Sequence, residues 1–238
     1  MYILALESTG PHASVAVIDD KGNVKEINND GTLNHLENLI PMVEELLKGE
    51  EIDIKEIDKV AVSVGPGSFT GIRIGVTTAR SLCQNLGIKG IPVPTLKSFA
   101  YAAEAFDGIV APMIDARRNQ IYGGAFKWNE GKVEDIIPAG PYMIDEFLEM
   151  LSGRTEKVMF FADGVKKFGE KIFETELDAK LAPEDIRLQH ASYVAKMAKD
   201  MDEEVSFDEL HPEYMRQAEA ERKREEKLNG TADCQTSK

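Results

Sequence analysis

Residues 63–75, SVGPGSFTGIRIG, have the composition of a loop that could bind phosphate. Glycines let backbone N–H groups point at an anion, and the hydroxyls of Ser68 and Thr70 could add hydrogen bonds. A Walker-type loop also needs a lysine, which is missing here, and Pro66 removes one N–H donor. The spacing does not match GxGxxG either. Phosphate binding stays open for this loop, but its spacing does not require it.

The residues after the loop favour a different use. A small residue recurs every four positions, at Gly71, Gly75, Ala79 and Cys83. On a helix these positions share one face, where another helix could approach until the backbones touch. Ile72 and Val76 beside them would add apolar contact. This face could pack inside the chain or against a partner protein, and the spacing alone leaves both open.

Other catalytic chemistry has little support. None of the four histidines and two cysteines falls in an HExxH or CxxC pattern. Cys83 is better explained as a packing residue than as a nucleophile, because no histidine neighbours it in the sequence. We therefore predict no metal site, no disulfide framework and a reducing compartment.

The charge of the chain limits what it can bind. Its 28 Lys and Arg against 42 Asp and Glu give a formal net charge of −14. A field of that sign repels phosphate backbones, so we expect the chain not to hold nucleic acid alone. No apolar run reaches the roughly 18–20 residues that cross a bilayer, and MYILALEST lacks the basic start of a signal peptide. A cytoplasmic location without membrane contact is expected.

Two similar series of elements are predicted. The first has strands at 2–8, 13–19 and 23–28, a helix at 32–48, a strand at 57–64, a helix from Thr70 as its cap to Gly87, a strand at 91–94 and a helix at 95–106. Pro41 should bend the first helix or mark its first turn. The second has strands at 109–115, 120–128 and 132–137, a helix at 144–151, a strand at 157–162, and helices at 165–177 and 190–201.

The order of these elements predicts an α/β protein built from two related halves. We place the first half at residues 1–106 and the second, shorter one at 107–216. Residues 217–238 are expected to form a charged C-terminal helix and a disordered tail.

Five segments in this order resemble the bacterial TsaB (YeaZ) family: MYILALEST, NHLENLIP, SVGPGSFTGIRIG, PMIDARRNQIY and HPEYMR. GPGSFTGIRIG together with DARRNQIY is highly specific. The resemblance implies the actin/sugar-kinase/Hsp70-like (ASKHA) fold, in which two lobes each contain a mixed sheet with flanking helices.

The resemblance also implies a role. Family members are partners of the catalytic subunit TsaD, and with the ATPase TsaE the complex moves a threonylcarbamoyl group onto the adenosine 3′ of the anticodon. The family member itself is not expected to catalyse. It would bind tRNA only through the complex and would form a homodimer when alone. ATP and metal would belong to the partner subunits, while weak nucleotide binding at the interface stays open.

In the family, pairing uses the helices of the N-terminal lobe. Carried onto this sequence, these are the 34–48 and 70–86 helices, with ten candidate contact residues: Leu36, Leu39, Ile40, Val43, Gly71, Ile72, Gly75, Val76, Ala79 and Cys83. The sequence does not assign the faces, and some of these residues will face the chain's own sheet.

The main alternative is a small-molecule kinase or ATPase of the same fold. Such enzymes carry an aspartate after the first strand, where this chain has Glu7, and a second Asp-Gly, for which Asp163-Gly164 is the candidate. A structural role for Glu7, such as accepting bonds from turn N–H groups, competes with this vestigial nucleotide site. No late Gly-Gly adenine motif is found. A peptidase lacks its ligands, because Thr95 and Phe99 stand where catalytic relatives have histidines.

Two further segments have open roles. In DARRNQIY, Asp115 could pair with Arg117 or Arg118 and end a strand, or one of the arginines could face the cleft between the lobes or a partner. HPEYMR is expected to dock the last segment onto the body through Pro212, Tyr214 and Arg216.

Overall fold

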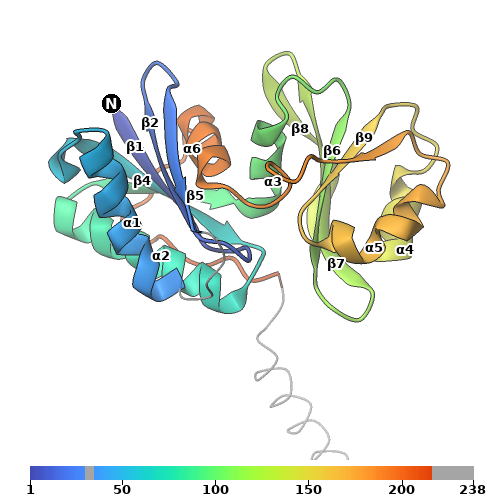
Figure 1. Ribbon diagram of the computed structural model, residues 1–238, viewed down its shortest axis with the longest axis horizontal. Helices are drawn as coiled ribbons and strands as arrows, with labels where there is room; N and C mark the ends of the chain where they lie inside the picture. Colours follow the sequence, from blue (N-terminus) through green and yellow to red (C-terminus); the bar gives the residue numbers. More distant parts are fainter. Residues whose placement is uncertain (30–34, 216–238) are drawn as a thin grey trace, which may run out of the picture.

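The computed structural model describes residues 1–29 and 35–215, without the side chains of 35–38. Two five-stranded sheets with the same topology form two lobes, side by side in Figure 1. In each sheet an antiparallel meander continues into parallel strands, as β3-β2-β1-β4-β5 and β10-β9-β6-β7-β8. The predicted two related halves are thus observed.

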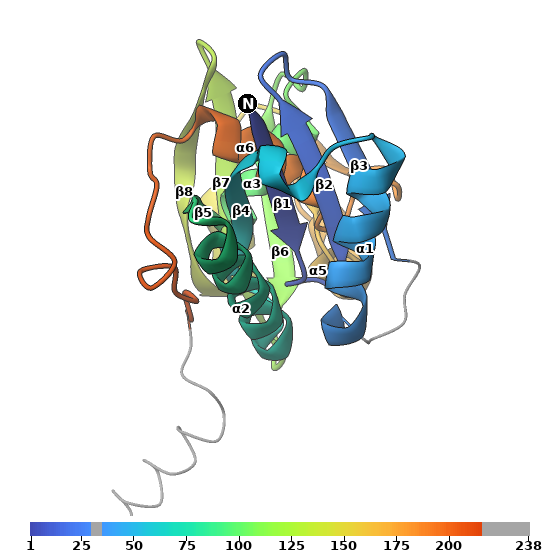
Figure 2. The ribbon, with the colours of Figure 1, turned by 90° about the vertical axis from the view of Figure 1, so that its left-hand side faces the viewer.

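The first lobe consists of β1 (Tyr2–Glu7), β2 (Ser14–Asp19), β3 (Val24–Asn28), α1 (His35–Gly49), the 3₁₀ turn η1 (Ile54–Glu56), β4 (Ile57–Gly65), α2 (Phe69–Leu86) and β5 (Lys89–Pro94). The central strands β1 and β4 are buried from Ile3 and Val60 onward because helices cover both faces of the sheet. The helices α1 and α2 pack on one face, and α6 (Ala191–Asp200) packs on the other (Figure 2).

The second lobe consists of β6 (Ile109–Asp115), β7 (Gln120–Asn129), β8 (Lys132–Met143), α4 (Ile144–Leu151), β9 (Val158–Phe161), α5 (Gly164–Phe173) and β10 (Ala179–Leu181). Its helices α4 and α5 cover the outer face of the sheet. The sequence did not indicate the short strand β10.

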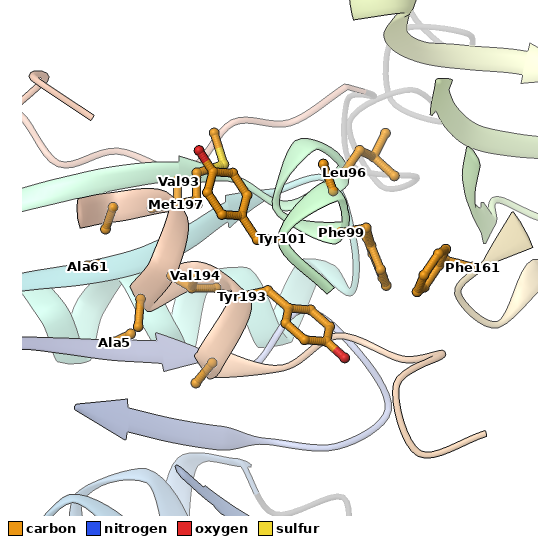
Figure 3. Close-up of a cluster of buried hydrophobic side chains, with 14 of the residues drawn as sticks. Ala5, Ala61, Val93, Leu96, Phe99, Tyr101, Phe161, Tyr193, Val194 and Met197 are labelled. Carbon is orange, nitrogen blue, oxygen red and sulfur yellow. The ribbon is translucent and has the colours of Figure 1, made fainter. Parts of the chain in front are cut away.

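A shared core joins the lobes (Figure 3). The segment expected as one helix over 95–106 is instead α3 (Thr95–Ser98) followed by the 3₁₀ turn η2 (Phe99–Ala102). The Phe99 ring lies 5.6 Å from that of Phe161 in the second lobe and 6.3 Å from that of Tyr193 on α6. Other elements enclose this segment on several sides, and so its consecutive side chains are nearly all buried. A regular amphipathic helix would instead bury one face and expose the other to solvent.

The chain returns to the first lobe after β10. The second lobe therefore ends earlier than residue 216, where the sequence analysis placed its end. Helix α6 packs on β1 and β2, and Val205 exchanges backbone hydrogen bonds of 2.9 Å with Gly90 beside β5. Leu210 is buried in the core beneath α2. Residues 190–215 thus complete the first lobe, while the expected charged helix and tail at 217–238 lie outside the described residues. Among those described, no helix is long and apolar enough to cross a membrane.

Candidate functional site

Glu7 ends β1 and has no exposed surface. Its Oε1 accepts hydrogen bonds from the Thr9 N–H at 2.5 Å and the Thr9 hydroxyl at 2.6 Å, and its Oε2 accepts one from the Ser63 hydroxyl. Burial raises the pKa of Glu7, against the lowering effect of these hydrogen bonds. The carboxylate thus connects the β1–β2 turn to β4, which is the structural role considered from the sequence.

Asp163 and Gly164 lie where β9 leads into α5, in the other lobe. The Asp163 Oδ1 accepts a hydrogen bond of 3.2 Å from the Asp115 N–H at the end of β6. Burial raises the pKa of Asp163, and the charge of Asp115 adds to this effect. A Cβ on Gly164 would lie 2.4 Å from the Met113 carbonyl oxygen, so glycine is required for this close approach. Asp163 and Gly164 thus connect the end of β9 to the end of β6 in the same sheet.

The small-residue face of α2 packs inside the chain. The six candidates on this helix, Gly71, Ile72, Gly75, Val76, Ala79 and Cys83, are all buried. A Cβ on Gly71 would lie 1.9 Å from the Ser8 carbonyl oxygen, and one on Gly75 would lie 2.5 Å from the Ser8 hydroxyl oxygen. The expectation that these six contact a partner is corrected, because β1, β4 and the β1–β2 turn already cover them.

On α1 the candidates divide between two faces. Leu39 and Val43 are buried against the sheet and are corrected in the same way, whereas Ile40 is 41% exposed. The side chain of Leu36 lies outside the described residues. Pro41 stands within the helix, which begins by His35.

The start of α2 differs from the sequence interpretation. Ser68, rather than Thr70, is the N-cap, and its hydroxyl accepts a hydrogen bond of 3.2 Å from the Gly71 N–H. The Ser68 N–H itself donates to the Thr9 carbonyl oxygen at 2.8 Å. Gly87 ends the helix in the left-handed conformation, as predicted. The backbone of the glycine loop is thus partly engaged with the β1–β2 turn.

An exposed aromatic pair was missed at this helix end. Phe69 is 40% exposed, and its ring stacks on Tyr214 with centroids 4.9 Å apart. The Arg73 guanidinium lies 5.1 Å from the centre of the Phe69 ring. The Glu213 N–H donates to the Val64 carbonyl oxygen at 2.8 Å. The segment 211–215 therefore docks onto the body as predicted, and the place where it docks is the glycine loop, with Tyr214 as its ring contact. Arg216 lies outside the described residues.

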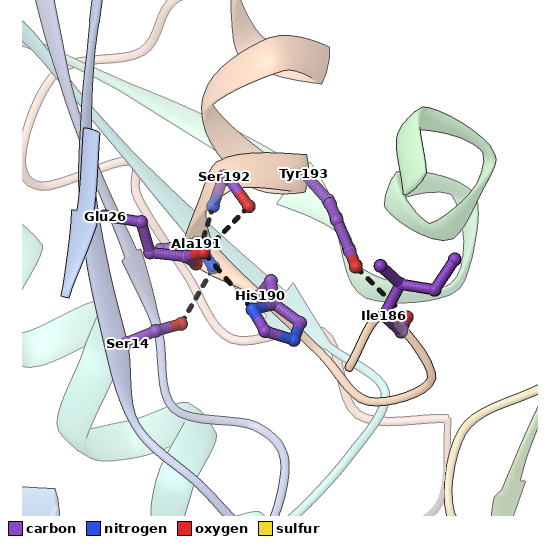
Figure 4. A network of polar contacts seen from close by, with 7 residues as sticks. All are labelled: Ser14, Glu26, Ile186, His190, Ala191, Ser192 and Tyr193. Carbon is purple, nitrogen blue, oxygen red and sulfur yellow. Dashed lines mark hydrogen bonds and ion pairs between the residues drawn. The ribbon is translucent and has the colours of Figure 1, made fainter. Parts of the chain in front are cut away.

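A polar network fastens α6 to the sheet of the first lobe (Figure 4). The Glu26 carboxylate on β3 lies 3.2 Å from Nδ1 of His190 and accepts hydrogen bonds from the N–H and the hydroxyl of Ser192. Burial alone would lower the pKa of His190, but the hydrogen bond and the charge of Glu26 raise it above the usual 6.5. The Ala191 N–H donates to the Ser14 hydroxyl at 2.8 Å.

The metal positions of catalytic relatives hold buried, non-ligating side chains here. Thr95 and Phe99 are both fully buried. Within the described part of the chain, no three His, Cys, Asp or Glu side chains come together in a way that could hold a metal ion.

Two lobes with equivalent mixed sheets, joined through a shared core, define an actin/sugar-kinase/Hsp70-like protein. A solved structure from Pseudomonas aeruginosa, described as similar to peptidase YeaZ, has this fold with a TM-score of 0.79 and 24% identity. It covers 90% of this chain and 99% of its own.

The sequence comparisons define the family. The model for TsaD, tRNA N6-adenosine threonylcarbamoyltransferase, matches residues 29–224. The tRNA threonylcarbamoyladenosine biosynthesis protein TsaB of Bacillus subtilis is 30% identical over 94% of this chain and 97% of its own length. TsaB of Haemophilus influenzae is 26% identical over 91% of this chain and 94% of its own length. The chain belongs to the TsaB (YeaZ) family.

Proposed function

We propose that the chain is a non-catalytic subunit of the complex that transfers a threonylcarbamoyl group to the adenosine 3′ of the anticodon in tRNAs reading codons that start with A. The observation that carries this proposal is the similarity to Bacillus subtilis TsaB over nearly the whole of both chains. The geometry of Glu7 supports the absence of catalysis. Its carboxylate is buried, and bonds from Thr9 and Ser63 engage both oxygens.

The catalytic partner in this proposal is TsaD, with the ATPase TsaE joining through the pair. The surface of this chain for TsaD is the exposed side of α1 and α2, which carries Ile40, Phe69 and Arg73. Large apolar and arginine side chains are typical of interface centres. Without TsaD the same surface pairs two copies of this chain. ATP and metal bind to the partner subunits in this proposal. At most, a nucleotide binds weakly at the interface between this chain and TsaD. The complex works in the cytoplasm.

Reconstitution tests the proposal. Purified TsaD, TsaE and the remaining enzymes from the same organism are supplied with tRNA, threonine, bicarbonate and ATP, with and without this chain. We expect modification to require the chain and the chain alone to hydrolyse no ATP. Equal modification without it would overturn the proposal. ATP hydrolysis by the chain alone that is lost in Glu7→Ala or Asp163→Ala would favour a kinase or ATPase.

A further inference from the structure

The turn between β6 and β7 presents two arginines on an unusual backbone. Arg117, Arg118 and Asn119 have φ values of 66°, 51° and 60°. The left-handed region costs about 1–2 kcal/mol for most residues, and less for Asn. The Arg117 N–H donates to the Asp115 carboxylate at 2.9 Å, and the Asn119 carbonyl oxygen accepts from the Ile144 N–H at 3.0 Å. Backbone contacts therefore fix where the two arginine side chains begin.

Neither guanidinium is neutralised within the described part of the chain. Both arginines are exposed, and no ion pair of the described residues includes them. Asp115, which the sequence offered as their partner, instead binds the Arg117 N–H and the Lys167 ammonium at 2.9 Å.

The first turn of α5 adds positive charge beside the arginines. Lys166 and Lys167 stand there, and the contact of Lys167 with Asp115 brings this turn to the end of β6. We call Arg117, Arg118, Lys166 and Lys167 the basic corner. Four cationic residues thus stand on two neighbouring segments, beside the carboxylates of Asp115 and Asp163, on a chain whose net charge is −14.

We propose that the basic corner contacts the phosphate backbone of the RNA held by the assembled complex, an inference that rests on the proposed function. Arginine binds phosphate through two parallel N–H donors. The acidic chain would repel free RNA, so the corner acts only over the roughly 8 Å reach of charge in physiological salt, once the complex holds the RNA close.

The position of the corner favours RNA over the proposed partner TsaD as the group that it contacts. It lies in the second lobe, whereas the surface proposed for TsaD is on α1 and α2, on the far side of the first sheet (Figure 1). The β6–β7 turn nevertheless lies at the same end of the molecule as the start of α2 in both ribbon views (Figures 1 and 2). RNA that lies along this end could therefore reach from the corner toward the edge of the surface proposed for TsaD, where the partner would hold it.

The test measures binding of an in vitro transcribed tRNA to the complex of this chain with TsaD, as a function of salt. The double variant Arg117→Gln/Arg118→Gln removes both charges, while each glutamine has to adopt the same left-handed backbone conformation as the arginine that it replaces. We expect at least about fivefold weaker binding, with the slope of log K against log salt reduced in magnitude by about 1–2. Arg154→Ala, a change at an exposed arginine elsewhere in the second lobe, is the control and should match wild type.

Two further readouts separate the explanations. Sedimentation of the protein pair without RNA should be unchanged in the double variant, and weaker pairing would show that the arginines contact protein instead. Unchanged tRNA affinity and salt slope, in a complex whose modification activity still needs this chain, would overturn the inference but leave the proposed function intact. If modification does not need the chain at all, both proposals fail.

Discussion

At the scale of single residues, Glu7 shows how a buried carboxylate can hold a turn to a neighbouring strand. Its carboxylate accepts bonds from both donors of Thr9 and from Ser63 while fully buried. Removing the carboxylate would leave the buried donors of Thr9 and Ser63 without an acceptor, and this costs free energy.

We therefore expect Glu7→Ala to lower the free energy of unfolding by about 2–4 kcal/mol, because three buried donors lose their acceptor and a cavity remains. Glu7→Gln should cost far less, since its oxygen can accept from Thr9 while its amide donates to the Ser63 hydroxyl. Urea denaturation of the purified chain measures both. Equal free energies of unfolding for wild type and Glu7→Ala would show that this carboxylate does not hold the turn to the strand.

His190 gives a prediction for pH. Burial lowers the pKa of His190, while Glu26 at 3.2 Å, a backbone hydrogen bond with Asp185 and the charge of Glu7 raise it. Because the folded pKa of His190 lies above its unfolded value, the stability from this contact is complete below about pH 6.5 and is lost as pH rises through the folded pKa. An NMR titration of the His190 ring should give a pKa above 6.5 in wild type and a lower one in Glu26→Gln. Equal values in the two proteins would show that Glu26 does not hold the imidazolium.

The site could be predicted only in part from the sequence, for reasons visible at particular residues. The turn role of Glu7 followed from a carboxylate two residues before Thr9, where the turn Thr9-Gly10-Pro11 begins. The N-cap predicted at Thr70 was wrong, because Ser68 suits an N-cap equally well and only the loop geometry selects it. The contact between Glu26 and His190 joins residues that are 164 positions apart, and no local pattern announces it.

At the scale of elements, the glycines of α2 set how closely the helix lies to β1. The Ser8 carbonyl oxygen occupies the space where a Cβ on Gly71 would stand, and this oxygen belongs to the backbone and cannot rotate away. The spacing of small residues correctly indicated a close approach, but the partner is the chain's own β1–β2 turn.

Gly71→Ala should therefore destabilise the chain by about 1–3 kcal/mol or more, because the helix must shift away from the turn. Gly169→Ala is the matched control. It also replaces a helical glycine, nothing lies within 4 Å of its added Cβ, and it should be neutral or stabilising by up to about 1 kcal/mol. Thermal melts followed by circular dichroism measure both. Equal melting temperatures would show that the close approach at Gly71 is not needed.

The burial of the small-residue face of α2 inside the chain also limits which variants can test pairing with a partner protein. Gly75→Leu would push against Ser8 and Val62 within the chain, so any loss of pairing would follow from damage to the fold. A useful variant must lie on the exposed side of the helices.

Most strands and helices were predictable because each has a clear period in its apolar residues. The exceptions are elements whose surroundings come from elsewhere. The segment 95–102 is enclosed by α6 and the second sheet, and so its form depends on distant residues. Similarly, α6 follows the second lobe in sequence but packs on β1 and β2, because those strands present an otherwise uncovered apolar face.

At the scale of the whole molecule, two equivalent lobes are held by a common core rather than by a flexible linker. Rings from η2, α6 and β9 meet there. Because packed side chains fill the contact between the lobes, the outer surfaces of the two lobes keep a fixed arrangement. Such an arrangement agrees with the proposed role as a subunit that binds partner proteins.

Those outer surfaces give the last prediction. Ile40 is 41% exposed on α1, and an apolar side chain of this size on a helix face is stabilised when a partner covers it. Ile40→Asp should abolish the homodimer and weaken pairing with TsaD at least about tenfold, because the carboxylate would be buried without a partner. Phe173→Asp on α5 is the matched control, since Phe173 is 60% exposed in the second lobe, and it should pair like wild type. Light scattering measures the homodimer, calorimetry measures binding to TsaD, and a thermal melt confirms that both variants fold. If Ile40→Asp pairs normally while Phe173→Asp does not, the interface lies on the second lobe and the surface of α1 and α2 has another use.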